Sequence, residues 1–155
     1  MIKPNMKIED EINQKKFKNE YQKLGINILF TSTWISSFNM QSLKPYGISW
    51  QQFNILRILK GMHPKPATVK LLTERMIDKM SNASRLVEKL KKKGLVERQA
   101  CDIDRRRVDI VITDSGMKLI AKASKDLEKD MFSNMSSLSD EEANQLNFLL
   151  DKLRG

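Results

Sequence analysis

The sequence predicts a mainly α protein of the α+β class, with several amphipathic helices and one short antiparallel β ribbon. Two patterns carry this prediction. Over most of the 155 residues, apolar side chains recur at intervals of three and four, the period of a helix with one buried face. Residues 95–113 differ, because they hold two short apolar stretches around a charged centre. The second stretch mostly alternates apolar with polar side chains, as a strand does.

The composition narrows the class of protein. A chain of 155 residues, 40% of them hydrophobic, can bury about two-thirds of its unfolded surface in one domain. The formal charge of +9 indicates an anionic partner or a strongly solvated surface. The single cysteine excludes an internal disulfide and fits a reducing compartment. No apolar run approaches the roughly 20 residues that span a bilayer, so we expect a soluble cytoplasmic protein without a membrane partner.

The first predicted helix covers residues 8–43, a stretch without proline. A helix of this length cannot bury a whole apolar stripe inside so small a domain, so we expect part of it to pack against a second copy of the chain. The segment Lys44–Gly47, with a proline and a glycine, ends it. Its stripe steps by fours and threes, at Phe17, Tyr21, Leu24, Ile28, Thr31, Ile35 and Phe38.

Two shorter helices follow. Ser49 and Gln52 fit a capping box that starts a helix over residues 50–60. After a proline-rich loop, a helix is predicted over residues 68–75. His63, the only histidine, lies in that loop without a Cys or His neighbour in the sequence, so no metal site is predicted.

The next predicted helix, over about residues 80–93, is the most informative element. Its apolar stripe is formed by Ala83, by Leu86 or Val87, and by Leu90. Gly94 follows three lysines and is a typical helix end, because glycine adopts the left-handed conformation easily and cations suit the C-terminus of a helix. The opposite face is polar and basic, with Ser81, Asn82, Arg85, Lys89 and Lys92.

A β ribbon is predicted after this helix, over about residues 95–113. Its strands, at 95–98 and 108–113, are joined by a charged tip that includes Arg105 and Arg106. A helix with a basic outer face followed by a hairpin with an arginine tip is a pattern typical of DNA-binding proteins.

Two more helices complete the chain. Thr113 can cap the first of them, which should fray near residues 136–137, and Ser139 and Glu142 form a second capping box. The apolar stripe of the first helix is formed by Met117, Ile120, Ala121, Ser124, Leu127 and Met131, and that of the second by Leu146, Leu149, Leu150 and Leu153.

Three stretches, Ser84–Arg98, Asp104–Arg106 and Thr113–Gly116, resemble in order and spacing the winged helix-turn-helix of the MarR family of bacterial transcription regulators. The resemblance implies one MarR-like domain over residues 1–155, with a winged helix-turn-helix at 49–113. It implies a homodimeric, sequence-specific DNA-binding regulator, which we expect to be a repressor that a small-molecule ligand releases.

In this family, the first and the last two helices of each chain interlock to form the dimer. The resemblance therefore implies that the N-terminal helices, residues 8–44, and the C-terminal helices, residues 115–154, form a dimerisation lobe. A two-fold dimer predicts a pseudo-palindromic operator in double-stranded DNA, with half-sites about one helical turn, roughly 34 Å, apart.

The candidate DNA contacts divide by chemistry. Short polar side chains and Arg85 suit base edges, the lysines suit phosphates, and arginines of the tip suit the minor groove. Asp104 and Arg106 match the wing pair of the family, and this role rests on the resemblance alone. The full set is Ser81, Asn82, Ser84, Arg85, Lys89, Lys92, Asp104, Arg105 and Arg106.

Members of the family also bind small aromatic acids or phenols between the dimer helices and the DNA-binding lobe. The resemblance therefore points to a possible aromatic effector beside Thr31, Trp34, Phe38 and Trp50. Aromatic side chains at helical spacing belong more often to a protein core than to a pocket, and both interpretations stay open.

Two alternative functions also stay open. A winged helix could serve as a protein-interaction module whose basic face meets an acidic partner. Cys101 could make a regulator responsive to oxidants, although its neighbour Asp102 should raise the thiol pKa, and known sensors of the family place the cysteine in the first helix. No enzyme and no cofactor are predicted, because one His, one Cys and no glycine-rich phosphate loop leave no plausible nucleophile and base.

Overall fold

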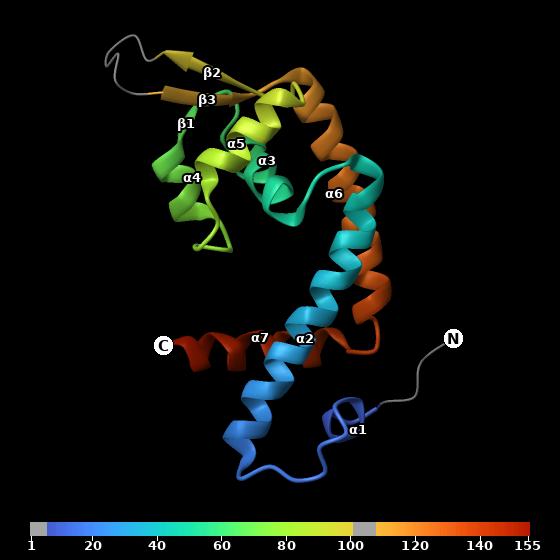
Figure 1. Cartoon of the computed structure of the whole chain (residues 1–155). Coiled ribbons are helices and arrows are strands. Elements are labelled where there is room, and N and C mark those ends of the chain that lie inside the picture. The colour runs from blue at the N-terminus through green and yellow to red at the C-terminus, as the bar shows by residue number, and fades with distance from the viewer. Residues whose placement is uncertain (1–5, 101–107) are drawn as a thin grey trace. The chain divides into compact units, whose positions relative to one another are not determined.

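The computed structural model describes residues 6–100 and 108–155 (Figure 1). The chain forms two units, residues 1–38 and 39–155, and the boundary falls inside helix α2 (Glu20–Leu43). Among the described residues, no helix is both long and apolar enough to cross a membrane.

The first unit contains α1 (Ile8–Glu11) and most of α2. The prediction of a single helix over residues 8–43 is wrong, because residues 12–19 between the two are not helical. Asn13 lies in the left-handed region, with φ of 53°, which interrupts a right-handed helix and which Asn tolerates better than most residues.

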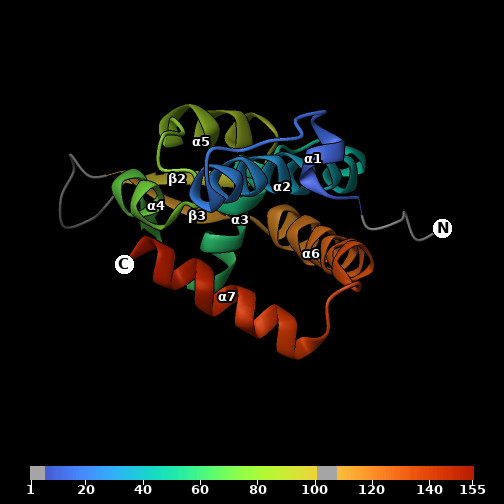
Figure 2. The same cartoon turned by 90° about the horizontal axis from the view of Figure 1, so that it is seen from below.

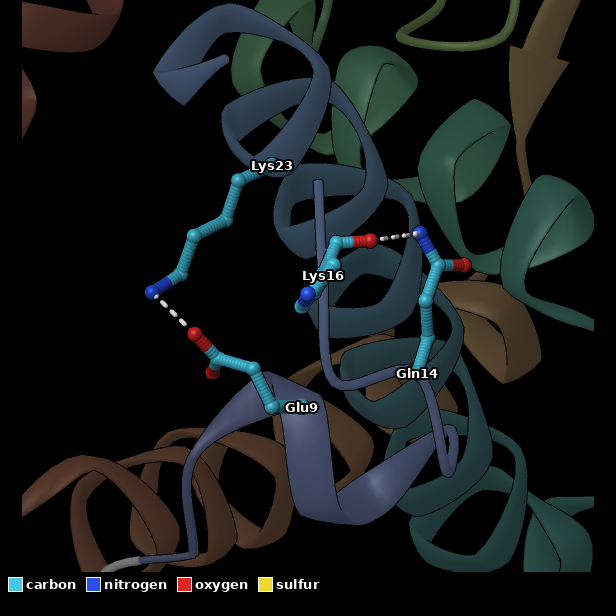
Figure 3. A network of polar contacts seen from close by, with 4 residues as sticks. All are labelled: Glu9, Gln14, Lys16 and Lys23. Atoms are coloured by element: carbon cyan, nitrogen blue, oxygen red, sulfur yellow. Dashed lines mark hydrogen bonds and ion pairs between the residues drawn. The ribbon is translucent and has the colours of Figure 1, made fainter. Parts of the chain in front are cut away.

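Side-chain hydrogen bonds and an ion pair stabilise the non-helical segment between α1 and α2. Asn19 Oδ1 accepts a hydrogen bond from the backbone N of Gln22 at 2.9 Å, which caps the start of α2. Figure 3 shows that Lys23 on α2 reaches Glu9 on α1, with 2.6 Å between Nζ and Oε1. In the same view, the Gln14 side-chain amide donates to the backbone carbonyl of Lys16 at 3.1 Å. Phe17, which the sequence assigned to the helical stripe, therefore lies in the segment between the helices.

The second unit follows the order of a winged helix. After the end of α2 and the 3-10 turn η1 (Lys44–Tyr46), its elements are α3 (Trp50–Met62), β1 (Ala67–Thr68), α4 (Val69–Arg75), α5 (Ala83–Lys92), β2 (Val96–Ala100), β3 (Val108–Ile112), α6 (Asp114–Met135) and α7 (Asp140–Arg154).

Helix α3 is the central element of this unit. It contacts α4, α5, α6 and β3, and it supplies the core with Phe53, Ile55, Leu56, Ile58 and Leu59 (Figures 1 and 2). The predicted capping box at its start is confirmed by reciprocal hydrogen bonds of Ser49 and Gln52.

The three strands form one antiparallel sheet in the order β1-β3-β2. In its register, Ala67 faces Ile110, Val96 faces Ile112, and Ala100 faces Val108. The two strands of the predicted ribbon are confirmed, with bounds shifted by one or two residues. Strand β1 was not predicted, because two residues are too few to show a strand period.

Helix α6 starts at the predicted cap, where Thr113 Oγ1 accepts from the backbone N of Gly116 at 3.0 Å. Its buried side includes Ile120 and Leu127, as predicted, but Ala121 is exposed and Ala123 is buried in its place. The Ser139 capping box of α7 is also confirmed. No residue of α7 is buried, and three leucines of its stripe, Leu146, Leu149 and Leu153, are exposed in this single chain.

Candidate nucleic-acid interface

The orientation of α5 is set by its apolar side. Ala83, Val87 and Leu90 are buried in the core against α3 and α4, as the sequence predicts, and Leu86 is half-buried. Because side chains three and four positions apart share one face of a helix, burial of this stripe directs the polar face to solvent. Asn82, which precedes the helix, and Ser84, Arg85, Lys89 and Lys92 within it are exposed.

The N-terminus of α5 is fixed by Asn82. Its Oδ1 accepts from the backbone N of Arg85 at 3.0 Å, so Asn82 is the N-cap of the helix. One of the two lone pairs of this oxygen is therefore engaged, while the amide Nδ2 is a donor for an outside group. The sequence indicates Asn82 as a base contact alone, and the structure adds the capping role.

The turn before α5 is organised by Asp78. Its Oδ2 accepts from the hydroxyl of Ser81 at 2.6 Å, and its Oδ1 accepts from the backbone N of Met80 at 3.1 Å. These bonds, the one from Ser81 first, hold the pKa of the Asp78 carboxyl below its ordinary value, and the Gln51 side chain contributes in the same direction. Because the hydroxyl of Ser81 donates to Asp78, Ser81 offers outside groups only an acceptor.

Four of the predicted contacts lie together around one hollow. Ser81, Asn82, Arg85 and Lys89 line an open depression of about 280 Å³, together with Gln51 of α3 and the half-buried Leu86. Ser84 and Lys92 are exposed on α5 outside its lining. The neighbouring Lys93 is turned away, because its Nζ donates to the backbone carbonyl of Gly47.

The β2–β3 ribbon is tied to α5 by an ion pair. Arg98 of β2 lies with its guanidinium nitrogen 2.7 Å from Oε1 of Glu88 on α5, and both side chains are partly exposed. Strand β2 therefore packs beside α5 (Figure 1). The predicted wing contacts Asp104, Arg105 and Arg106 lie outside the described residues, as does Cys101.

The predicted effector residues fall into both units. In the first, the rings of Trp34 and Phe38 meet edge to face, with centroids 5.3 Å apart, and Thr31 is exposed on the same helix. In the second, Trp50 stacks on Phe53 at 5.6 Å between ring centroids. The structure thus brings Trp34 and Phe38 together, and it gives Trp50 a partner from the core.

Three polar residues that shape this interface were not predicted from the sequence. Asp78 had a local signal, because an Asp followed three residues later by Ser is a common turn pattern. Asn54 is 2% exposed, and its Oδ1 accepts from the backbone N of Ile77 at 2.9 Å. Its signal was a polar residue inside an otherwise apolar stretch of α3. Gln51 had no signal, because only the folded chain brings it from α3 to Asp78 and to the hollow beside α5.

Among residues 6–100 and 108–155, no three His, Cys, Asp or Glu side chains gather as a metal site requires. The polar face of α5 instead offers hydrogen-bonding and cationic groups on a fixed helix. This chemistry suits an anionic partner with polar edges, such as duplex DNA.

Comparison with known proteins finds similar proteins among transcription regulators. The family model described as the MarR family matches residues 46–107. The HTH-type transcriptional regulator MgrA of Staphylococcus aureus is 29% identical over 116 residues, which are 75% of this chain and 76% of that protein.

Solved structures share the fold. The S. aureus MepR–DNA complex matches with a TM-score of 0.75 and 24% identity, over 89% of this chain and 97% of that one. The organohalide-sensing transcriptional regulator RdhR, in its form bound to 2,4-dichlorophenol, matches with a TM-score of 0.78 and 23% identity, over 90% of this chain and 86% of that one. With the order of elements and the polar face of α5, these matches lead to one conclusion: the chain has the winged-helix fold seen in MarR-family transcription regulators, and its residues 46–107 match the model of that family.

Proposed function

We propose that this protein is a homodimeric, sequence-specific DNA-binding transcription regulator that represses by occupying an operator. The observation that carries the proposal is the fixed polar face of α5. The N-cap at Asn82 and the Asp78 turn hold the start of the helix, and Arg85 and Lys89 lie beside them around one hollow. A helix presented in this way can enter a major groove, about 12 Å wide, with its N-terminal residues on base edges.

The contacts divide by chemistry along the helix. At its start, the Asn82 amide and Arg85 are suited to base edges, since an amide can pair with adenine and a guanidinium with guanine. Ser81 and Ser84 supplement them with short hydroxyls. Further along, Lys89 and Lys92 suit phosphates, which add affinity without sequence choice. At the wing, we propose that Arg105 and Arg106 enter the minor groove, with Asp104 holding the tip.

The dimer is proposed to form through the helices at both ends of the chain, residues 8–44 and 115–154. On α7, Leu146, Phe148, Leu149 and Leu153 are between 46% and 65% exposed. A stripe of this kind costs free energy in water and is typical of a surface that another chain covers. Residues 49–113 would then form the DNA-binding lobe of each subunit.

Release by a small aromatic ligand is the proposed control. RdhR was solved with 2,4-dichlorophenol bound, and its fold is similar to this one. The residues proposed to line the ligand site here are Thr31, Trp34, Phe38 and Trp50. A regulator that acts on bacterial genes works in the cytoplasm, and it needs no catalytic chemistry to do so.

Salt dependence separates DNA binding from the alternative of an acidic protein partner. Anisotropy of a labelled duplex should show the affinity falling steeply between about 50 and 200 mM salt, with a log-log slope near 0.9 per phosphate neutralised. Lys92→Ala should lower that slope by about one per subunit. The control Lys122→Ala, which changes an exposed lysine of α6, should leave it unchanged. Salt-insensitive binding of DNA would contradict the proposal.

A further inference from the structure

Two large apolar side chains are exposed beside the polar face of α5. Met80 is 94% exposed, more than any other large hydrophobic side chain among the described residues, and Ile77 is 62% exposed. Both belong to the turn between α4 and α5, directly before Ser81 and Asn82. Single exposed apolar side chains are ordinary on a protein surface, but two of this size within one turn, next to a polar and cationic helix face, mark a candidate interaction site.

The exposure is a fixed feature of the turn, because hydrogen bonds hold the backbone on both sides of Met80. The backbone N of Ile77 donates to Oδ1 of the buried Asn54 at 2.9 Å. The backbone N of Met80 donates to Oδ1 of Asp78 at 3.1 Å, and the next residue, Ser81, donates its hydroxyl to the same carboxylate at 2.6 Å. Met80 therefore points outward from an ordered turn, and little backbone entropy remains to be lost when it meets a partner.

The surroundings of Met80 indicate the partner. The exposed residues that follow it in the chain include Asn82 and Arg85, whose amide and guanidinium suit base edges rather than an apolar protein surface. The major groove of DNA carries one apolar group, the C5 methyl of thymine. Methionine, with its flexible and polarisable side chain, adapts well to a small apolar target of this kind.

We propose that Met80, flanked by Ile77, packs on the C5 methyl of a thymine in the major groove, next to the base pair that Asn82 or Arg85 contacts. Met80 is then a specificity-determining residue that selects thymine at one position of each half-site. This inference rests on the proposed DNA-binding function and adds to it an apolar contact. The expected size is that of one buried methyl group, which corresponds to about a fourfold change in affinity for each thymine.

Deoxyuridine gives a sharp test, because it pairs as thymidine does and lacks only the C5 methyl. The probe is the duplex that the wild-type protein selects from random DNA, with each thymine of a half-site replaced singly by deoxyuridine. The wild-type protein should bind about fourfold more weakly when one particular thymine is replaced. Replacement of thymines outside the half-site should change the affinity little.

Variants of Met80 assign the effect to its side chain. Met80→Gln keeps the length but places a polar amide at the end, so it should bind the thymine and deoxyuridine duplexes equally. Met80→Leu keeps the apolar surface and should retain the discrimination. The control Met6→Gln makes the same change at a methionine that is 51% exposed near the N-terminus, and it should discriminate as the wild type does. Since Met80 is exposed, all variants should melt at the wild-type temperature.

The outcomes separate this inference from the proposed function. If the wild-type protein binds its selected duplex but no single deoxyuridine weakens binding, or if Met80→Gln discriminates as the wild type does, the inference is overturned and DNA binding stands. A selected half-site without thymine has the same meaning. If the folded protein binds no DNA at all, both are overturned.

Discussion

The structure shows Asn82 as a helix cap, and we propose that it is also a base contact; two substitutions separate these two roles. As the N-cap of α5, its Oδ1 accepts from the backbone N of Arg85 at 3.0 Å. As an exposed residue at the start of the same helix, its amide is free to contact a base. Alanine removes both roles, whereas serine keeps the cap, because Ser and Asn are about equally good N-caps.

The expected magnitudes differ for the two variants. Loss of the cap in Asn82→Ala should cost about 1 kcal/mol of unfolding free energy. For a protein of this size, that lowers the melting temperature by about 2–4 °C. Asn82→Ser should melt within error of the wild type. In DNA binding, both variants should lose about 1–3 kcal/mol of discrimination at one base pair of each half-site.

Two assays suffice for this test. Thermal unfolding followed by circular dichroism measures the cap, and anisotropy titrations of the selected duplex and its single-base variants measure the base contact. If Asn82→Ser bound all duplexes as the wild type does, Asn82 would be a cap alone. If Asn82→Ala melted as the wild type does, the cap would contribute no stability.

Substitutions in α5, α6, α7 and the turn before α5 test four other features of the structure. Arg85→Ala should cost about 1–3 kcal/mol and relax discrimination at one base pair, whereas Lys92→Ala should weaken all duplexes about equally; equal effects of the two in anisotropy titrations would contradict this. Leu149→Asp should reduce dimerisation in sedimentation and DNA binding together, and a fully dimeric variant would exclude α7 from the interface. Gly116→Ala places a Cβ 2.2 Å from the carbonyl oxygen of Leu95, so urea unfolding should show a loss of about 1–3 kcal/mol or more, and a smaller loss would show that the backbone adjusts. The lowered pKa of Asp78 means that its stabilisation is complete above the ordinary value of 3.8 and is lost as the pH falls below it, so Asp78→Asn should melt with a weaker acid dependence than the wild type; an identical dependence would contradict this assignment.

Local patterns in the sequence were enough to predict much of the fold. The capping boxes at Ser49 and Ser139 and the cap at Thr113 involve residues three positions apart, so their hydrogen bonds depend on the local backbone alone. The buried stripe of α5 was predictable for a similar reason, since its spacing matches the helix period over about two turns. These local patterns were enough to predict most of the helix bounds.

Other features depend on contacts that spacing does not show. The break at residues 12–19 falls inside a continuous helical pattern, and it is held by Asn13 in the left-handed region and by the Glu9–Lys23 ion pair. Strand β1 exists because β3 provides an edge for it, which no local pattern of two residues can indicate. On α6, the buried alanine is Ala123 instead of Ala121, since the neighbouring elements decide which side of a broad stripe is covered.

The candidate interface shows the same division. The sequence predicted the polar residues of α5, because an apolar stripe on one face leaves the opposite face outside. It did not predict that Ser81 donates its hydroxyl to Asp78 or that the buried Asn54 holds Ile77. The second of these contacts joins residues 23 positions apart in the sequence, so only the folded chain shows it.

Selection of bound sequences from random duplex DNA, at about 150 mM salt, shows whether the α5 face distinguishes bases. A dimer with one α5 in each half-site should enrich a two-fold symmetric motif whose half-sites lie about one helical turn, roughly 34 Å, apart. If the protein is folded and dimeric and enriches no sequence, it does not distinguish bases in DNA, and the account of the α5 face is wrong.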